Sequence, residues 1–290
     1  MSLDHKIDFA VVLSVHNANP NGDPLNGNRP RQNYDGYGEI SDVALKRKIR
    51  NRLQDMGGSI FVQSNDRKVD AYGSLRERAD ANANLNKIMK TKNLSSEEFA
   101  KVACEEWIDV RSFGQVFAFK GAGSGGGVSV GVRGPVSIHT ARSIEPIDIT
   151  SMQITKSVSS EPGKERGSDT MGMKHRVDFG VYVFKGSINT QLAEKTGFTN
   201  DDAERIKQSL ITLFENDLSS ARPEGSMEIH KVYWWEHKSK LGQYSSAKVH
   251  RSLVIKENPD ATEEEKNTHA RYTYTLEQLD GLEVQEYEGL

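Results

Sequence analysis

Apolar and polar positions along this chain recur with two different periods, which predict strands and helices in turn. Ile7–Val15 is an almost continuous apolar run, and residues 177–183 are apolar at every second position, so both predict strands. Apolar residues recur at helical spacing after Ser41 and after Thr199, two residue types that cap helices well. Met227–Trp235 predicts a further strand.

The segment between the first helix and position 140 is less regular. Residues 57–94 are polar and irregular, and we expect an insertion or a partner-facing lobe there. A capping box of Ser95 and Glu98 then predicts another helix. Gln115–Lys120 and Val128–His139 predict two strands, which the glycine-rich residues 121–127 join.

The remaining segments carry weaker signals. Residues 150–174 are polar, contain several turn residues and show no helical periodicity, whereas 248–256 and 271–276 give weak strand signals. Two strand–helix–strand units together with an antiparallel pair of strands are typical of a ferredoxin-like, or RRM-type, core. The sequence therefore predicts an α+β fold of this class.

Composition and charge narrow the class of protein. The 290 residues are 36% hydrophobic and 27% charged with a net charge of −3, so any surface for nucleic acid must be local. Five acids in Glu257–Glu265 balance basic patches elsewhere. The single cysteine, Cys104, argues against a disulfide framework and a Cys-rich zinc site. Since no apolar run approaches eighteen residues and no signal pattern begins the chain, we expect a soluble, cytoplasmic protein.

Residues 16–31, HNANPNGDPLNGNRPR, are the first candidate for a binding site. They hold five asparagines, three prolines and two glycines between a predicted strand and a predicted helix. Asn and Gly tolerate left-handed backbone, and a long polar loop on a rigid scaffold is a frequent place for function. A well-capped connection without a ligand explains the loop equally well when it is considered alone.

Some segments partly match motifs for cofactors, calcium or catalysis, but each lacks a feature that the motif requires. Residues 121–126 match G-x-G-x-x-G, but a strand pattern follows where a dinucleotide site needs a helix. Asn17 at the first position and Asn28 at the twelfth do not suit a calcium loop, which needs Glu at the twelfth. The eight histidines are scattered, and no nucleophile-elbow sequence occurs. We therefore expect no cofactor, no metal and no catalytic residue.

Basic residues gather around two of the predicted segments. On the helix after Ser41, Lys46, Arg47 and Arg50 flank the buried face, just after a loop that ends in Arg29 and Arg31. Basic and amide groups surround the second irregular segment, at Gln153, Lys156, Lys164, Arg166, Lys174, His175 and Arg176. Such groups bind phosphate and ribose oxygens, although a solvated helix face explains the basic helix alone. Because an RNP-type aromatic signature is missing, binding along the backbone fits better than base stacking.

Six short motifs occur in a specific order over most of residues 7–238. They are N-x-N-x-N-G-D-P at 17–24, S-D-V-A-L-K-R at 41–47, W-I-D-V-R-S-F-G at 107–114, R-G-P-V at 133–136 with A-R-S-I-E-P at 141–146, D-T-M-G-M-K-H at 169–175, and D-L-S-S-A-R-P-E-G-S-M at 217–227. In this combination the chain resembles the backbone subunit of CRISPR Cascade complexes, the "Cas seven" family of the RAMP superfamily, of the kind found in type I-C and I-B systems.

The resemblance implies a subunit shaped like a right hand. Residues 1–56 and 110–256 would form an RRM-like palm with a β-hairpin thumb at 150–176, and 57–109 a helical finger lobe. Residues 257–290 would form an acidic C-terminal segment with the last strand. Copies stack head to tail along a CRISPR RNA, and each thumb displaces a base so that the segments between pair with target DNA.

The resemblance also implies which residues bind RNA. For contacts with the guide backbone we expect Asn17, Asn19, Asn21, Arg29, Arg31, Lys46, Arg47 and Arg50. In the thumb we expect Lys156, Met171, Lys174, His175 and Arg176, with Met171 or Met173 inserted between bases. The expected partners are CRISPR RNA, target DNA, further copies of the chain, and the guide-processing and large subunits of Cascade. Guide processing and DNA cleavage belong to other proteins in such systems, so we expect no enzyme activity.

Two other functions stay open from the sequence. Type III backbone subunits cleave target RNA with a metal ion, and Asp23 or Asp35 would be the residue to hold a metal-bound water here. Neutral amides, however, dominate this loop. Alternatively, the loops dock neighbouring protein subunits and the basic residues are ordinary surface.

Overall fold

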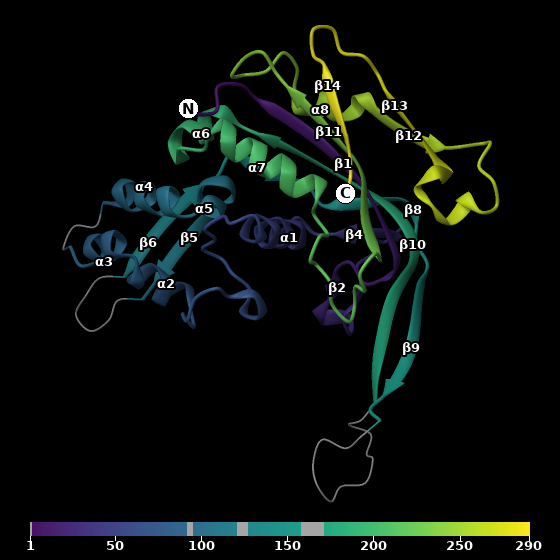
Figure 1. Ribbon diagram of the computed structural model, residues 1–290, viewed down its shortest axis with the longest axis horizontal. Helices are drawn as coiled ribbons and strands as arrows, with labels where there is room; N and C mark the ends of the chain where they lie inside the picture. Colours follow the sequence, from purple (N-terminus) through teal and green to yellow (C-terminus); the bar gives the residue numbers. More distant parts are fainter. Residues whose placement is uncertain (1, 92–94, 121–126, 158–170) are drawn as a thin grey trace, which may run out of the picture.

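A large antiparallel sheet organises the protein in the computed structural model, which describes residues 2–91, 95–120, 127–157 and 171–290 (Figure 1). Its strand order is β14-β11-β1-β10-β8-β4, and β7 and β9 also pair with β10. The strands are β1 (Ile7–Ala18), β4 (Tyr37–Ile40), β7 (Val136–Ile138), β8 (Ala141–Pro146), β9 (Ile149–Thr155), β10 (Met171–Ile188), β11 (Met227–Glu236) and β14 (Val284–Glu288). The predicted mixture of helices with an antiparallel sheet is confirmed.

β1 lies in the middle of the sheet because its side chains are apolar on both faces. Phe9 and Val11 point into one core, and Ala10 and Val12 into the other. Helices α1 (Asp42–Asp55) and α7 (Asn200–Ile211) cover the first face. Helix α8 (Ser246–Ser252) covers the second, with the strand pair β12 (Leu253–Glu257) and β13 (Tyr272–Leu276).

The two helices on the first face begin where the sequence predicts. The hydroxyl of Ser41 accepts a hydrogen bond from the amide of Ala44 at the start of α1, and Leu45, Ile49 and Leu53 are buried. Thr199 and Asp202 form a reciprocal capping box at the start of α7. Short α6 (Thr190–Thr196) precedes α7. Both predictions rest on local capping chemistry and are confirmed.

The insertion after α1 is more ordered than its polar sequence suggests. It contains α2 (Leu75–Ala81), α3 (Ala83–Met89), α4 (Ser96–Glu106), α5 (Ile108–Phe113) and the paired strands β5 (Gly114–Phe119) and β6 (Val128–Arg133). We call residues 57–133 the insertion lobe. The polar sequence of 57–94 has no clear periodicity, yet α2 and α3 form there, and Phe61, Leu85 and Ile88 enter a core around Phe99 and Phe117.

Two strand predictions need correction beside this lobe. The pairing of β5 with β6 confirms the predicted hairpin, whose residues 121–126 lie outside the described residues. Val128–His139, however, is not one strand. The strand is interrupted at Gly134 and Pro135, and the part that follows, β7, joins the large sheet. Proline at the break cannot donate a ladder hydrogen bond, which favours the end of a strand there.

Residues 150–174 contribute to a two-stranded ribbon. β9 pairs with the first part of β10 from Ile149 opposite Val177 to Thr155 opposite Met171, and the ribbon projects away from the sheet (Figure 1). Its strands carry polar side chains on both faces, so no apolar alternation marked them in the sequence. Residues 158–170 between the strands lie outside the described residues.

The C-terminal part differs partly from its prediction. The expected strand at 248–256 is instead α8 followed by β12, while β13 confirms the signal at 271–276. The sequence did not indicate β14, which adds an edge strand to the sheet beside β11.

The remaining short elements are β2 (Gly22–Asp23), β3 (Arg29–Pro30), η1 (Pro24–Asn26), η2 (Asn65–Arg67), η4 (Glu265–Asn267) and η5 (His269–Arg271). Within the described ranges, every helix is too short or too polar to cross a bilayer.

Candidate nucleic-acid interface

The Asn-rich segment folds into a small hairpin beside the large sheet. Gly22 pairs with Pro30 and Asp23 with Arg29, and the turn between them contains η1. Gly27 and Asn28 adopt left-handed backbone at the end of this turn, with φ of 56° and 61°. The residue types that marked the segment in the sequence are therefore required by its turn, because they tolerate positive φ at low cost.

The asparagines of this segment have different tasks. The side-chain amide of buried Asn19 donates to the carbonyl of Asn28 at 2.7 Å, which closes the hairpin. The side-chain oxygen of Asn21 accepts from the amide of Ser41 at 2.9 Å, which links the hairpin to the start of α1. Asn17 is exposed and has a positive φ of 53°. Asn19 and Asn21 thus shape the loop, whereas Asn17 faces solvent.

Asp23 and Arg31 hold the base of the hairpin together. The Asp23 carboxylate caps η1 by accepting from the amide of Leu25 at 3.2 Å, and it lies 3.4 Å from the guanidinium of Arg31. Asp35, the other acid of this region, is exposed at the next turn. In the described part of the chain, no three His, Cys, Asp or Glu residues are grouped in a way that could hold a metal ion.

A three-residue junction joins the hairpin to the ribbon. Arg29 donates to the hydroxyl of Ser151 in β9 at 2.8 Å, and Nδ1 of His175 in β10 lies 2.8 Å from the same hydroxyl. Both hydrogen bonds lie at the surface, where Ser151 is exposed and Arg29 and His175 are partly buried. The junction links the hairpin to the ribbon and places cationic Arg29 between them.

The ribbon separates the predicted thumb residues onto two faces. Met171, Met173 and His175 alternate along β10 and lie opposite Thr155, Gln153 and Ser151, so these residues share the face that meets Arg29. Each of the two methionines is 55% exposed. We call this the methionine face.

Lys174 and Arg176 project from the other face of the ribbon. They lie opposite Met152 and Thr150, beside the exposed Ile154. Lys156 follows β9 and is exposed. Lys164 and Arg166 lie outside the described residues. The sequence grouped these cations with Met171 and His175, but the pleat of the strand divides them.

The basic residues of α1 all have partners within the chain. Lys46 pairs with Asp42 at 3.0 Å, and Arg47 donates to the carbonyl of Val62 at 2.7 Å. Arg50 lies 3.0 Å from Asp109, whose side chain is fully buried. Burial lowers the pKa of the Arg47 guanidinium. Arg47 and Arg50 thus connect α1 to the insertion lobe, whereas the pair of Lys46 lies within the helix.

A second loop, residues 212–226, supports the hairpin from the other side. The amide of Asn19 donates to the carbonyl of Ala221 at 2.9 Å, and the amide of His16 to that of Ser226 at 2.8 Å. None of the site residues predicted from the sequence lies in this loop, although the motif at 217–227 marked it. The interface is thus built from three segments that are far apart in sequence.

An ion triad around the buried Lys48 anchors the 212–226 loop to α1. Asp217 bonds the Lys48 ammonium and accepts from the Arg222 guanidinium at 3.1 Å. Burial lowers the pKa of Lys48 to about 8, against the opposing attraction of Asp217. The side chain of Arg222 is 28% exposed. Asp217 and Arg222 of the motif at 217–227 therefore serve to hold this loop against α1.

Comparisons with known proteins show the family and the fold of the chain. The family model described as "CRISPR-associated protein Cas7" matches residues 5–277. A curated protein of Haloferax volcanii with the same description is 25% identical over 233 residues, which span 76% of this chain and 67% of that protein. A solved chain of a "CRISPR RNA-guided surveillance complex, pre-nicking" has a TM-score of 0.50 at 13% identity, covering 79% of this chain and 78% of that one. The structural likeness shows a shared fold.

Proposed function

This chain belongs to the Cas7 family of CRISPR-associated proteins, and we propose that it is a non-catalytic backbone subunit that binds CRISPR RNA in a type I Cascade complex. Copies of it would line the guide head to tail, together with the guide-processing and large subunits, and leave bases free to pair with target DNA. The similar solved chain that belongs to a CRISPR RNA-guided surveillance complex supports a role in such a complex.

The proposed palm is an RRM-like core within the large sheet. The order β11-β1-β10 followed by β7 or β8, with all pairs antiparallel, is the strand order of ferredoxin-like proteins and supports this proposal. Residues 1–56 and most of 110–256 would form the palm, and the ribbon at 150–176 the thumb. We extend the finger lobe from 57–109 to Arg133, because Phe117 and Val130 pack in its core. Residues 257–290 contribute β14 to the sheet and β13 beside it.

The junction of Arg29, Ser151 and His175 is the observation that carries the RNA-binding proposal. It places a guanidinium in the angle between a rigid hairpin and a ribbon whose methionine face is exposed. A guanidinium there would neutralise a phosphate, and an exposed methionine next to it would press on a base. We propose RNA contacts for Asn17, Arg29, His175 and Met171 or Met173.

The other residues selected from the sequence divide into two groups in this proposal. Lys156, Lys174 and Arg176 would meet the phosphates that pass the other side of the thumb. The intrachain contacts of Asn19, Asn21, Arg31, Lys46, Arg47 and Arg50 support a role in shaping the surface beneath the RNA.

RNA binding at two or more salt concentrations tests this proposal. For single-stranded RNA, Arg29→Ala should weaken binding and lower the log–log salt slope by about 0.7, the value for one lost phosphate contact. Arg251→Ala is the matched control, because Arg251 is exposed on α8, on the opposite face of the sheet. If the salt slope of Arg29→Ala equals that of the wild type, the proposed RNA surface is wrong. The alternative, in which these loops dock neighbouring protein subunits, would then be favoured.

A further inference from the structure

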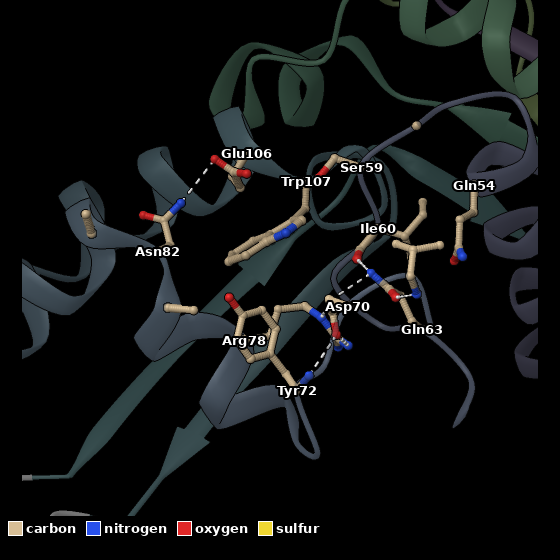
Figure 2. Close-up of a pocket in the computed structure, with 14 residues that line it drawn as sticks. Gln54, Ser59, Ile60, Gln63, Asp70, Tyr72, Arg78, Asn82, Glu106 and Trp107 are labelled. Carbon is tan, nitrogen blue, oxygen red and sulfur yellow. Dashed lines mark hydrogen bonds and ion pairs between the residues drawn. The ribbon is translucent and has the colours of Figure 1, made fainter. Parts of the chain in front are cut away.

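The insertion lobe contains a pocket that the proposed guide surface does not use. The cavity has a volume of about 430 Å³ and lies between the segment after α1 and the helices α2 to α4. Its walls include Tyr72 and Trp107, with Ser59, Asn82 and Glu106 around them (Figure 2). The size falls within the range of small-molecule sites. The lobe lies on the other side of α1 from the ribbon (Figure 1).

Trp107 brings an unused hydrogen-bond donor to this pocket. The residue is only 4% exposed because its ring packs on Phe61, with ring centroids 4.5 Å apart. A buried indole N–H normally finds an acceptor, as that of Trp234 does in the Glu236 carboxylate at 2.9 Å. No protein group in the described residues accepts from the indole N–H of Trp107, and this atom is not closed off from solvent. Water or a ligand in the pocket can therefore reach it.

Tyr72 and Glu106 supply the other free groups. Tyr72 is 37% exposed, and among the described side chains its hydroxyl has no hydrogen-bond partner. One oxygen of Glu106 accepts from the side chain of Asn82 at 3.1 Å, which leaves the second oxygen for a ligand. Figure 2 shows the Trp107 and Tyr72 rings facing the same space, with Asn82 and Glu106 at one side.

The charges of the pocket exclude a phosphate from its interior. Asp70 is neutralised by Arg78, which contacts it through two nitrogens at 2.7 and 2.9 Å. Glu106 therefore carries the uncompensated charge, and it is negative. Outside the pocket, the Lys68 ammonium bonds the carbonyl of Tyr72 at 3.2 Å, so a cation lies on the Tyr72 side. A ligand with a flat, neutral end inside and a phosphate outside fits this polarity.

We propose that this pocket binds an unpaired nucleobase that carries an exocyclic amino group, adenine or cytosine. The base stacks against Tyr72, its amino group donates to Glu106, and its ring nitrogen accepts from the Trp107 indole. Adenine and cytosine place a donor beside an acceptor on their Watson–Crick edge, which suits a pocket whose lining offers one carboxylate and one indole N–H. Uracil presents the opposite pattern at that edge and lacks the amino group. The inference goes beyond guide-backbone binding, because it assigns a base-reading site to the lobe.

Ligand-observed NMR titrations with AMP, CMP, UMP and dAMP test the site directly. AMP and CMP should bind more tightly than UMP, and Tyr72→Ala should weaken AMP binding about fivefold or more through lost stacking. Glu106→Gln should bring the affinities for AMP and UMP closer together. Equal binding of dAMP would assign the site to either nucleic acid, and loss with dAMP would assign it to RNA.

Tyr34→Ala is the matched control, since Tyr34 is a fully exposed tyrosine in the chain after the hairpin. Thermal unfolding of each variant shows that it is folded. Equal affinity for AMP and UMP, or an equal loss in Tyr34→Ala, would overturn the proposal. So would binding of acetyl-arginine-amide in place of AMP, which would indicate a peptide site. These titrations are independent of Arg29, so failure here leaves the proposed RNA surface to its own test.

Discussion

Arg50 of α1 lies 3.0 Å from Asp109 of α5, and this ion pair joins the sheet unit to the insertion lobe. Asp109 is fully buried and also accepts from the amides of Phe61 and Val62 at 2.7 and 3.1 Å. Three donors from two segments thus converge on one carboxylate. Asp109 is the acid of the motif W-I-D-V-R-S-F-G. Its role in the structure is to hold the insertion lobe together and to join it to α1.

Removal of this carboxylate should strongly destabilise the protein. Asp109→Ala leaves the Arg50 guanidinium, 13% exposed, and two amides without their acceptor, so we expect a loss of about 3–5 kcal/mol in the free energy of unfolding. Urea unfolding measures the change. Asp42→Ala is the control, since its pair with Lys46 lies at the surface and contributes about 1 kcal/mol or less. A loss at Asp109 no larger than at Asp42 would contradict the assigned role.

Stability should rise with pH in the range where Lys48 titrates. Burial lowers the pKa of Lys48 from 10.5 to about 8, so between these values the unfolded chain binds more protons than the folded one. Stability attributable to Lys48 is therefore gained as pH increases from about 8 to 10.5, by up to about 3 kcal/mol.

Comparison with Lys48→Met isolates this contribution from other groups that titrate at high pH. The difference in free energy of unfolding between wild type and variant should shift in favour of the wild type over that range. A difference that stays constant with pH would show that Lys48 has an ordinary pKa in the folded protein.

Asp23 should contribute to the hairpin and have no part in RNA cleavage. One oxygen of its carboxylate, Oδ1, both caps η1 and pairs with Arg31, so the hairpin accounts for this residue without a metal ion. We expect assembled complex with Mg²⁺ to leave a matched target RNA intact on a denaturing gel. Cleavage by the wild type that disappears in Asp23→Ala, but persists in Asp35→Ala, would establish a nuclease instead.

The methionine face of the ribbon should displace a base, and the opposite face should not. With 2-aminopurine in the guide of an assembled complex, replacement of both Met171 and Met173 by Ala should lower the fluorescence that unstacking produces. Ile154→Ala is the control on the other face, where the side chain is 48% exposed. If Ile154→Ala lowers the signal as much, the assignment of faces is reversed.

The sequence by itself determined the elements whose signals are local. The continuous apolar run of Ile7–Val15 specifies a strand buried on both sides, and Ser41 and Thr199 specify helix starts through hydrogen bonds to residues three positions later. The ordered motifs also sufficed for the family. Each of these features depends on residues close together in the chain, so no knowledge of the fold was needed.

Only the tertiary structure decided what the polar residues do. The family resemblance implied RNA contacts for Asn19, Asn21 and Arg50, and the structure adds their intrachain partners, which are Asn28, Ser41 and Asp109. The ribbon face of each thumb residue depends on strand register, and the free indole N–H of Trp107 on packing of the lobe. A polar side chain bonds whichever group the fold brings near it, and in the junction of Arg29 with Ser151 that group lies 122 positions away. Local sequence patterns carry no record of such distant neighbours.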